Sequence, residues 1–253
     1  MPVLGFGLHI FVAILCAVHV LRTGQERWWL FVLFLFPLLG SIIYVLAVFL
    51  PEMSRSRGGR RVVRGLRDSL DPGRELREAE AEFEQLATIA NRIRVADALH
   101  GVGRNEDAIS AYREALHGVH SDDPDIQVKL ARALLDQGEA TAARELLESL
   151  ISSRPDFKSP DGHLIYARAL AACGERDKAR EEFDALIGYY AGIEARVRYI
   201  EVLESWDENK AAVDLVAESL HHVKLMPAGS RRLNAEWIHE LKRASARLAA
   251  ANS

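Results

Sequence analysis

Apolar and polar positions divide the chain into two parts of different character. Residues 3–21 and 28–50 form runs of 19 and 23 residues without any Asp, Glu, Lys or Arg. At about 1.5 Å of rise per residue, a helix of either length crosses a hydrocarbon layer of roughly 30 Å. An amphipathic helix of a soluble core would instead show polar residues at a period of about 3.6. The pattern therefore predicts a transmembrane helical hairpin over residues 1–50.

Beyond residue 70, one pattern of residues occurs four times. Each copy has a glycine or aspartate, a small residue five positions later, a bulky residue four positions after that, and a small or apolar residue three positions further on. The copies are Gly103, Ala108, Tyr112 and Ala115; Gly138, Ala143, Leu147 and Leu150; Gly174, Ala179, Phe183 and Leu186; and Asp207, Ala212, Val216 and Ser219. The alanines that are their second members are 35, 36 and 33 residues apart, a spacing typical of stacked helical repeats.

This repeat resembles the tetratricopeptide repeat, an antiparallel helix pair of about 34 residues. Upstream of each copy lies an apolar segment with a residue at the expected contact between the two helices, namely Ala96, Ala131, Ala167 and Ile200. The resemblance implies an α-solenoid over residues 71–253, with a terminal capping helix over residues 231–250. The predicted fold class is therefore all-α, with Trp237, Leu241 and Leu248 of the capping helix facing the stack.

Composition excludes several classes of function. A formal net charge of −4 over 253 residues argues against general nucleic-acid binding, which requires a surplus of cations. Two cysteines, Cys16 and Cys173, cannot build a disulfide framework or a metal knuckle. In the first apolar run, His9, Cys16 and His19 are either a functional group within the membrane or neutral side chains bonded to the partner helix. No metal and no cofactor are expected, because further ligands are missing.

A basic junction, residues 51–70, separates the two parts. The loop between the apolar runs contains only Arg22 and Arg27 as basic residues, whereas six arginines follow the second run. They are Arg55, Arg57, Arg60, Arg61, Arg64 and Arg67. Because basic residues concentrate on the cytoplasmic side of membrane proteins, we expect both termini and the repeat domain in the cytoplasm. We also expect these arginines to contact anionic lipid headgroups.

The second apolar run contains residues that predict a bend. Pro37 lacks the N–H that a helix interior requires, and the hydroxyl of Ser41 can bond back to a carbonyl there. Gly40 allows the two spans to approach closely. Two interpretations stay open at this stage: a kinked and packed hairpin, or a lipid or substrate site at the bend.

The segment "PLLGSIIY", from Pro37 to Tyr44, resembles the membrane segment of cardiolipin synthases of the phospholipase D nuclease N-terminal type. The resemblance covers about residues 5 to 51 and implies a two-span anchor in a bacterial inner membrane. It does not extend to the enzyme, whose soluble part carries two copies of H-x-K-x4-D. The one near-match here has His222 and Lys224, but Gly229 replaces the aspartate. A single defective copy cannot supply the paired nucleophile and acid, so no enzymatic activity is expected.

The repeat register also predicts a charged groove on the first helices of the pairs. Five cations project towards it, namely Arg94, Lys129, Arg132, Arg168 and Arg198, together with Asp97, Glu201 and Glu204. Such a row can bind a carboxylate or an acidic peptide, or it can simply solvate an exposed face. The groove departs from the carboxylate-binding pattern of the family, which uses asparagines, since Asn91 is the one asparagine near such a position.

Together these features indicate a membrane-anchored scaffold that presents a cytoplasmic groove to a protein or peptide partner. The alternative is an accessory subunit of phospholipid or envelope synthesis that acts through the hairpin.

We predict that the full chain stays with membrane vesicles after washing with high salt and with alkaline carbonate. Each apolar run would bury its side chains in hydrocarbon, which neither treatment disrupts. Immunoblotting of pellet and supernatant measures the result, with a peripheral protein as the control that is released. Release of this chain as well would contradict the predicted hairpin.

Overall fold

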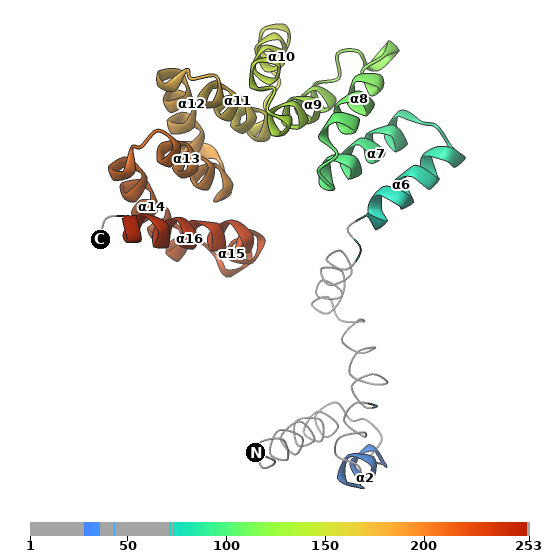
Figure 1. Ribbon diagram of the computed structural model, residues 1–253, viewed down its shortest axis with the longest axis vertical. Coiled ribbons are helices and arrows are strands. Elements are labelled where there is room, and N and C mark those ends of the chain that lie inside the picture. The colour runs from blue at the N-terminus through green and yellow to red at the C-terminus, as the bar shows by residue number, and fades with distance from the viewer. Residues whose placement is uncertain (1–27, 36–42, 44–70, 72, 252–253) are drawn as a thin grey trace. The chain divides into compact units, whose positions relative to one another are not determined.

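A computed structural model describes residues 28–35, 43, 71 and 73–251 (Figure 1). The chain forms two compact units, Met1–Arg74 and Glu75–Ser253. In the first unit, helix α2 (Trp28–Leu35) contains apolar residues throughout, and Phe31 and Phe34 are 78% and 89% exposed. None of the helices in the described ranges combines the length and the apolar character that crossing a bilayer requires.

Most of the residues predicted for the membrane part lie outside the described residues. This applies to the run at 3–21, to the basic junction at 51–70, and to nearly all of the run at 28–50 beyond α2. The individual residues concerned are Pro37, Gly40, Ser41 and Tyr44 at the predicted bend; Arg55, Arg57, Arg60, Arg61, Arg64 and Arg67 at the junction; and His9, Cys16 and His19.

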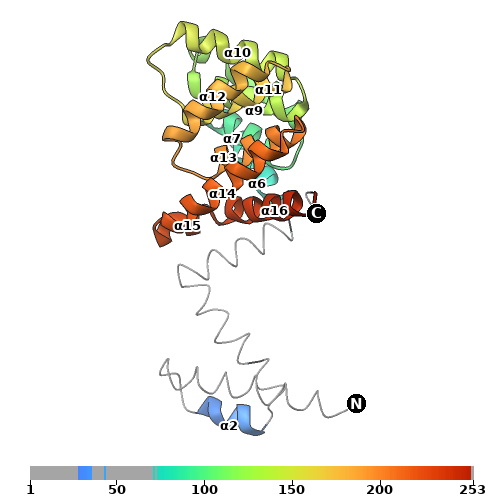
Figure 2. The same cartoon turned by 90° about the vertical axis from the view of Figure 1, so that its left-hand side faces the viewer.

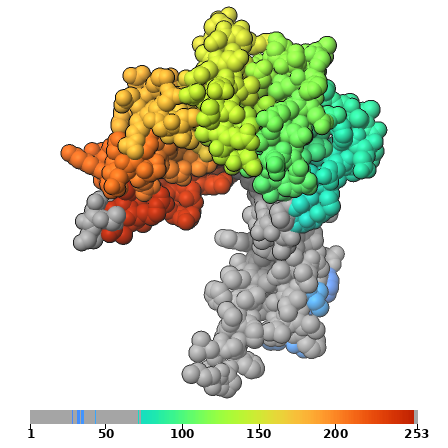
Figure 3. All heavy atoms as spheres, turned by 45° about the horizontal axis from the view of Figure 1, so that its top comes forward, coloured from blue at the N-terminus to red at the C-terminus, as the bar shows by residue number. Residues whose placement is uncertain are grey.

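The second unit is a stack of antiparallel helices. They are α6 (Arg74–Gln85), α7 (Ile89–Gly101), α8 (Asn105–Ala115), the 3-10 helix η2 (Gly118–His120), α9 (Pro124–Gln137), α10 (Ala140–Ser153), α11 (Pro160–Ala172), α12 (Arg176–Tyr189), α13 (Glu194–Ser205), α14 (Asn209–Leu225), α15 (Ala228–Leu233) and α16 (Ala235–Ala251). No strand occurs in the described part of the chain, which agrees with the all-α prediction. The helices follow one another along the stack in sequence order (Figure 3).

Pairs of helices form the repeating unit, and the pairs stack into an arc. In the three central pairs, α7 packs on α8, α9 on α10 and α11 on α12. Figure 1 shows α7, α9, α11 and α13 along the inner side of the arc and α8, α10 and α12 along the outer side. We call these two sets the inner and the outer helices.

The turn inside each pair has the same geometry in all four copies. The turn residue adopts a left-handed conformation, with φ of 79° at Gly103, 92° at Gly138, 82° at Gly174 and 65° at Asp207. The next residue donates its backbone N–H to the carbonyl of a buried leucine near the end of the inner helix, over 2.9 Å at Leu99, 2.8 Å at Leu134, 3.0 Å at Leu170 and 2.9 Å at Leu203. Glycine suits this turn because it has no Cβ, so Asp207 marks the strained copy.

Small residues let the two helices of each pair approach each other. The predicted contact residues are all fully buried, with 0% exposure at Ala96, Ala108, Ala131, Ala143, Ala167, Ala179, Ile200 and Ala212. Two apolar clusters result. One runs from α6 to α11 and the other from α11 to α16, and α11 contributes Ile165 to the first and Leu164 to the second. Helix α11 therefore joins the two halves of the core.

The C-terminal end of the stack differs from the single capping helix that the sequence predicts. The chain forms a short α15 and a long α16, with Asn234 between them (Figure 2). The Asn234 side chain accepts a hydrogen bond from the backbone N–H of Ile193 over 2.9 Å and donates one to the carbonyl of Ser230 over 3.0 Å. The break between α15 and α16 therefore places the side-chain amide of Asn234 at the start of α13. Leu241 and Leu248 of α16 are buried against the second cluster.

We predict that Ala131→Leu lowers the free energy of unfolding by about 1–3 kcal/mol, because the packed helices leave no room for a larger side chain. Ala185 lies exposed on α12, so Ala185→Leu serves as the matched control and should change stability by less than about 0.5 kcal/mol. Chemical unfolding followed by circular dichroism measures both. Equal effects of the two substitutions would contradict the packing at Ala131.

Candidate functional site

The five cations predicted for the groove all lie on inner helices. Arg94 is on α7, Lys129 and Arg132 are on α9, Arg168 is on α11 and Arg198 is on α13. All five therefore belong to one set of helices, whose surface we call the inner face. Each of them also pairs with a carboxylate, so the inner face alternates positive and negative charge.

The first of these pairs forms around Asp97 on α7. Its carboxylate accepts a hydrogen bond from the hydroxyl of Tyr112 on α8 over 2.6 Å and from the ammonium of Lys129 on α9 over 2.8 Å. Tyr112 is 2% exposed. Burial raises the pKa of the Tyr112 hydroxyl above its usual range, and the hydrogen bond to Asp97 raises this pKa further. Asp97 thus connects three helices and has a structural role.

Two further pairs join α9 to α11. Arg132 lies 3.8 Å from the carboxylate of Asp161, and Arg168 donates to Asp136 over 3.3 Å. Asp136 also contacts His100 of α7 over 3.0 Å. The hydrogen bond with His100 lowers the pKa of Asp136, and the charge of Arg168 contributes to this shift. Side chains from three successive inner helices therefore meet at Asp136.

Arg168 and Arg198 line one cavity of about 340 Å³ on the inner face. Its other lining residues include Leu135, Glu201 and Ser205. The guanidinium of Arg198 donates to Glu201 over 3.0 Å and lies 4.8 Å from the centre of the Trp237 ring on α16. Burial lowers the pKa of Arg168, and the positive charge of Arg198 lowers it further. The two arginines therefore repel each other, and an anion between them would reduce that repulsion.

Arg94 and Asn91 lie apart from this cavity, at the N-terminal end of the inner face. Arg94 forms an ion pair with Glu82 of α6. The Asn91 amide donates to the carbonyl of Leu86 over 2.8 Å, and its backbone N–H donates to the side chain of Thr88, which caps α7. Asn91 is thus engaged in the connection between α6 and α7, although its position resembles that of an asparagine that binds ligand.

The sequence-based prediction missed several partners of the cations, among them Glu82, Asp136, Asp161 and Trp237. A regularity in the sequence could have indicated one of these contacts. Lys129 follows Asp97 by 32 residues, and Arg168 follows Asp136 by 32 residues. An acid in one repeat and a base 32 residues later face each other across neighbouring inner helices. No such offset indicates the contact between Trp237 and Arg198, because the capping helices lie outside the repeat register.

A comparison of the sequence with known protein families supports the repeat pattern. Residues 99–161 match a family model described as a tetratricopeptide repeat. The matched segment extends from the end of α7 to the start of α11, so it includes complete outer and inner helices. A search among curated proteins found no match. The prediction of tetratricopeptide repeats is confirmed for this segment, whereas no comparison supports the resemblance of residues 5 to 51 to cardiolipin synthases.

We predict that Asp97→Ala lowers the free energy of unfolding by about 1–3 kcal/mol, because the buried hydroxyl of Tyr112 loses its acceptor. Lys129→Met removes only the exposed ion pair and should cost less than about 1 kcal/mol. In a Tyr112→Phe background, Asp97→Ala should cost about 1 kcal/mol less than in the native chain. Additive effects in this double-mutant cycle, measured by chemical unfolding, would show that the two residues are not coupled.

Proposed function

We propose that the chain is a membrane-anchored interaction scaffold whose inner face binds an acidic segment of a protein partner. Tetratricopeptide repeats suggest a protein-interaction scaffold, and the match at residues 99–161 supports this class of function. The one observation that carries the position of the site is the cavity shared by Arg168 and Arg198, which belong to successive inner helices. Burial, and after it the positive charge of Arg198, lowers the pKa of Arg168 there.

Charge and geometry support an acidic ligand at this cavity. Arg168 is half-buried and has lost part of its hydration, and the carboxylate of Asp136 balances one of the two positive charges. Glu201 pairs with Arg198 at the edge of the cavity, where its side chain is 41% exposed. An incoming carboxylate would compete with an exposed ion pair worth only about 0.2–1 kcal/mol. Guanidinium groups offer two parallel N–H donors, a geometry that suits a carboxylate.

Anchoring in the membrane rests on the sequence alone. The uncharged runs at 3–21 and 28–50 and the arginines of residues 51–70 support a hairpin with the repeats on the cytoplasmic side of a bacterial inner membrane. In this arrangement the protein would hold its partner at the membrane surface and would perform no chemistry of its own.

A photo-crosslinking amino acid at Ser205, which is exposed and lines the cavity, tests the proposed site in intact cells. We expect a discrete adduct with a partner protein that is absent when the crosslinker is placed at Arg113, on the exposed side of the outer helix α8. Arg168→Gln combined with Arg198→Gln should reduce the adduct at least about tenfold, since two charged hydrogen bonds of about 1.5–3 kcal/mol each would be lost. Immunoblotting of the adduct measures this loss.

The control for this experiment carries the same change in charge at another place. Arg113→Gln combined with Arg232→Gln removes two exposed arginines away from the cavity and should leave the adduct unchanged. Arg168→Lys combined with Arg198→Lys retains both charges and should recover part of the adduct. If the glutamine variant folds, as circular dichroism would show, and still forms the full adduct, then the inner face is not the binding site.

A further inference from the structure

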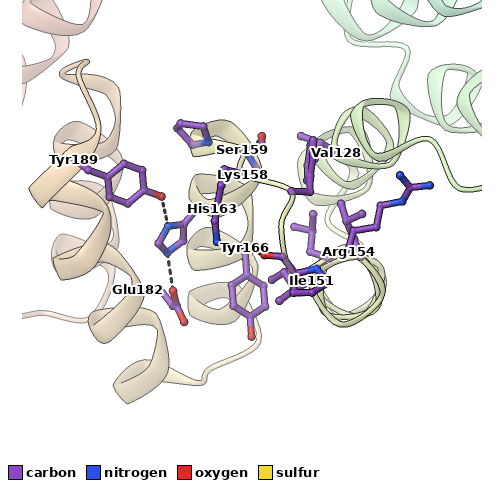
Figure 4. A pocket seen from close by; sticks show the side chains of 15 residues that line it. Val128, Ile151, Arg154, Lys158, Ser159, His163, Tyr166, Glu182 and Tyr189 are labelled. Carbon is purple, nitrogen blue, oxygen red and sulfur yellow. Dashed lines mark hydrogen bonds and ion pairs between the residues drawn. The ribbon is translucent and has the colours of Figure 1, made fainter.

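A second and larger cavity shares no lining residue with the cavity of the arginine pair. Its volume is about 700 Å³, within the range of about 300–1,000 Å³ that is typical of ligand sites. Its walls come from the outer helices α10 and α12, from the first turns of the inner helix α11 and from the connection at 154–159 (Figure 4). None of the five cations of the inner face lines it. We call it the outer cavity.

The floor of the outer cavity is apolar. Leu147 and Leu150 of α10 and Val128 of α9 are buried there, with exposures of 2%, 3% and 8%. At the mouth, Ile151 of α10 and Tyr189 of α12 are each 54% exposed. A mouth of this kind leaves large apolar side chains in contact with water, and covering them would release free energy.

Hydrogen-bonding groups form the wall on the α12 side. His163 of α11 lies between two residues of α12, with Nε2 at 2.6 Å from a carboxylate oxygen of Glu182 and with Nδ1 bonded to the hydroxyl of Tyr189 (Figure 4). The carboxylate of Glu182 is therefore held by a hydrogen bond within the protein, and its side chain is 37% exposed at the cavity wall.

Two cations also line the outer cavity. Arg154 forms an ion pair with Asp122 and keeps 43% of its side chain exposed. Lys158 donates to the backbone carbonyl of Pro155 over 3.3 Å, and no carboxylate of the described residues lies within 4.0 Å of its ammonium group. Among the described residues, Lys158 is thus the one cation lining the cavity that has no acidic partner, and it lies next to the apolar floor.

The geometry points to a second interaction site, in which the outer cavity binds a peptide segment of a partner protein that carries bulky apolar side chains next to a carboxylate. The apolar side chains would cover Ile151 and fill the floor, and the carboxylate would pair with Lys158. A wide mouth flanked by two helices suits side chains inserted from another protein. The site is independent of the inner face, so the scaffold would hold two different partners, or two segments of one partner.

Two labelled heptapeptides with blocked ends provide the test, Gly-Ser-Leu-Phe-Asp-Ser-Gly and the same peptide with Lys in place of Asp. Their binding to the full chain in lipid nanodiscs is measured by fluorescence anisotropy, with empty nanodiscs subtracted. We expect the Asp peptide to bind roughly fivefold or more tightly than the Lys peptide, because a direct ion pair replaces a repulsion at the rim. This preference should decrease as the salt concentration rises.

Substitutions then locate the site. Lys158→Glu should reverse the preference between the two peptides. Ile151→Ser should lower the affinity for both peptides by a similar factor. Lys242→Glu, an exposed lysine on α16, makes the same change in charge elsewhere and should leave both affinities unchanged. Arg168→Gln combined with Arg198→Gln should also leave them unchanged, which separates this site from the proposed function of the inner face.

Three results would overturn the inference. The first is equal binding of the Asp and Lys peptides, and the second is an effect of Lys158→Glu no larger than that of Lys242→Glu. The third is binding of octanoate without binding of either peptide, which would assign the outer cavity to a small amphiphile.

Discussion

Close packing of two helices through small residues is the contact on which the stack depends. Ala131 and Ala143 represent it in the second pair, where both residues are fully buried. A larger residue at either position would separate the helices and displace every side chain along their length. Because the next pair packs against this one, the displacement would spread along the stack. Alanine at the crossing thus determines where the inner and outer helices place their remaining side chains.

The charges of the inner face follow from this packing. Successive inner helices lie side by side, so a residue on one helix meets a residue on the next at almost constant separation along the chain. Asp97 with Lys129 and Asp136 with Arg168 are two examples of the same offset. The two charges of each such pair balance each other, so little unbalanced charge is left for a ligand along most of the face. Arg168 and Arg198 are paired as well, but their two positive side chains share one cavity.

The two cavities differ in a way that suits two ligands. The inner cavity is small and charged, so it would bind an anion through guanidinium groups. The outer cavity is larger and apolar, with a single unpaired lysine among the described residues of its rim, so it would bind mainly through apolar side chains. Helix α11 contributes Arg168 to the first cavity and His163 to the second, and its buried residues join both halves of the core. A ligand at either cavity would therefore contact the helix that connects the two clusters.

The contacts in the structure differ in how directly the sequence indicates them. The turn geometry repeats wherever the pattern repeats, and even the irregular copy at Asp207 adopts the left-handed conformation of the glycines. Its side chain accepts a hydrogen bond from the Asn209 amide over 3.3 Å, a local contact that helps an aspartate occupy such a turn. The break at Asn234 has no counterpart in the repeat, because it depends on a hydrogen bond to Ile193, which is 41 residues earlier in the chain.

The sequence by itself determined the all-helical class of the repeat part, the position of the turns and the identity of the buried alanines. These features depend on residues within one repeat, where the spacing of small, bulky and turn-forming residues is visible in the chain. Only the tertiary structure decided how the five predicted cations are paired, that Trp237 lies against Arg198, and that a cavity opens between α10 and α12. Those features depend on side chains from different repeats, and the distance between such side chains is set by the stacking of helices rather than by their order in the sequence.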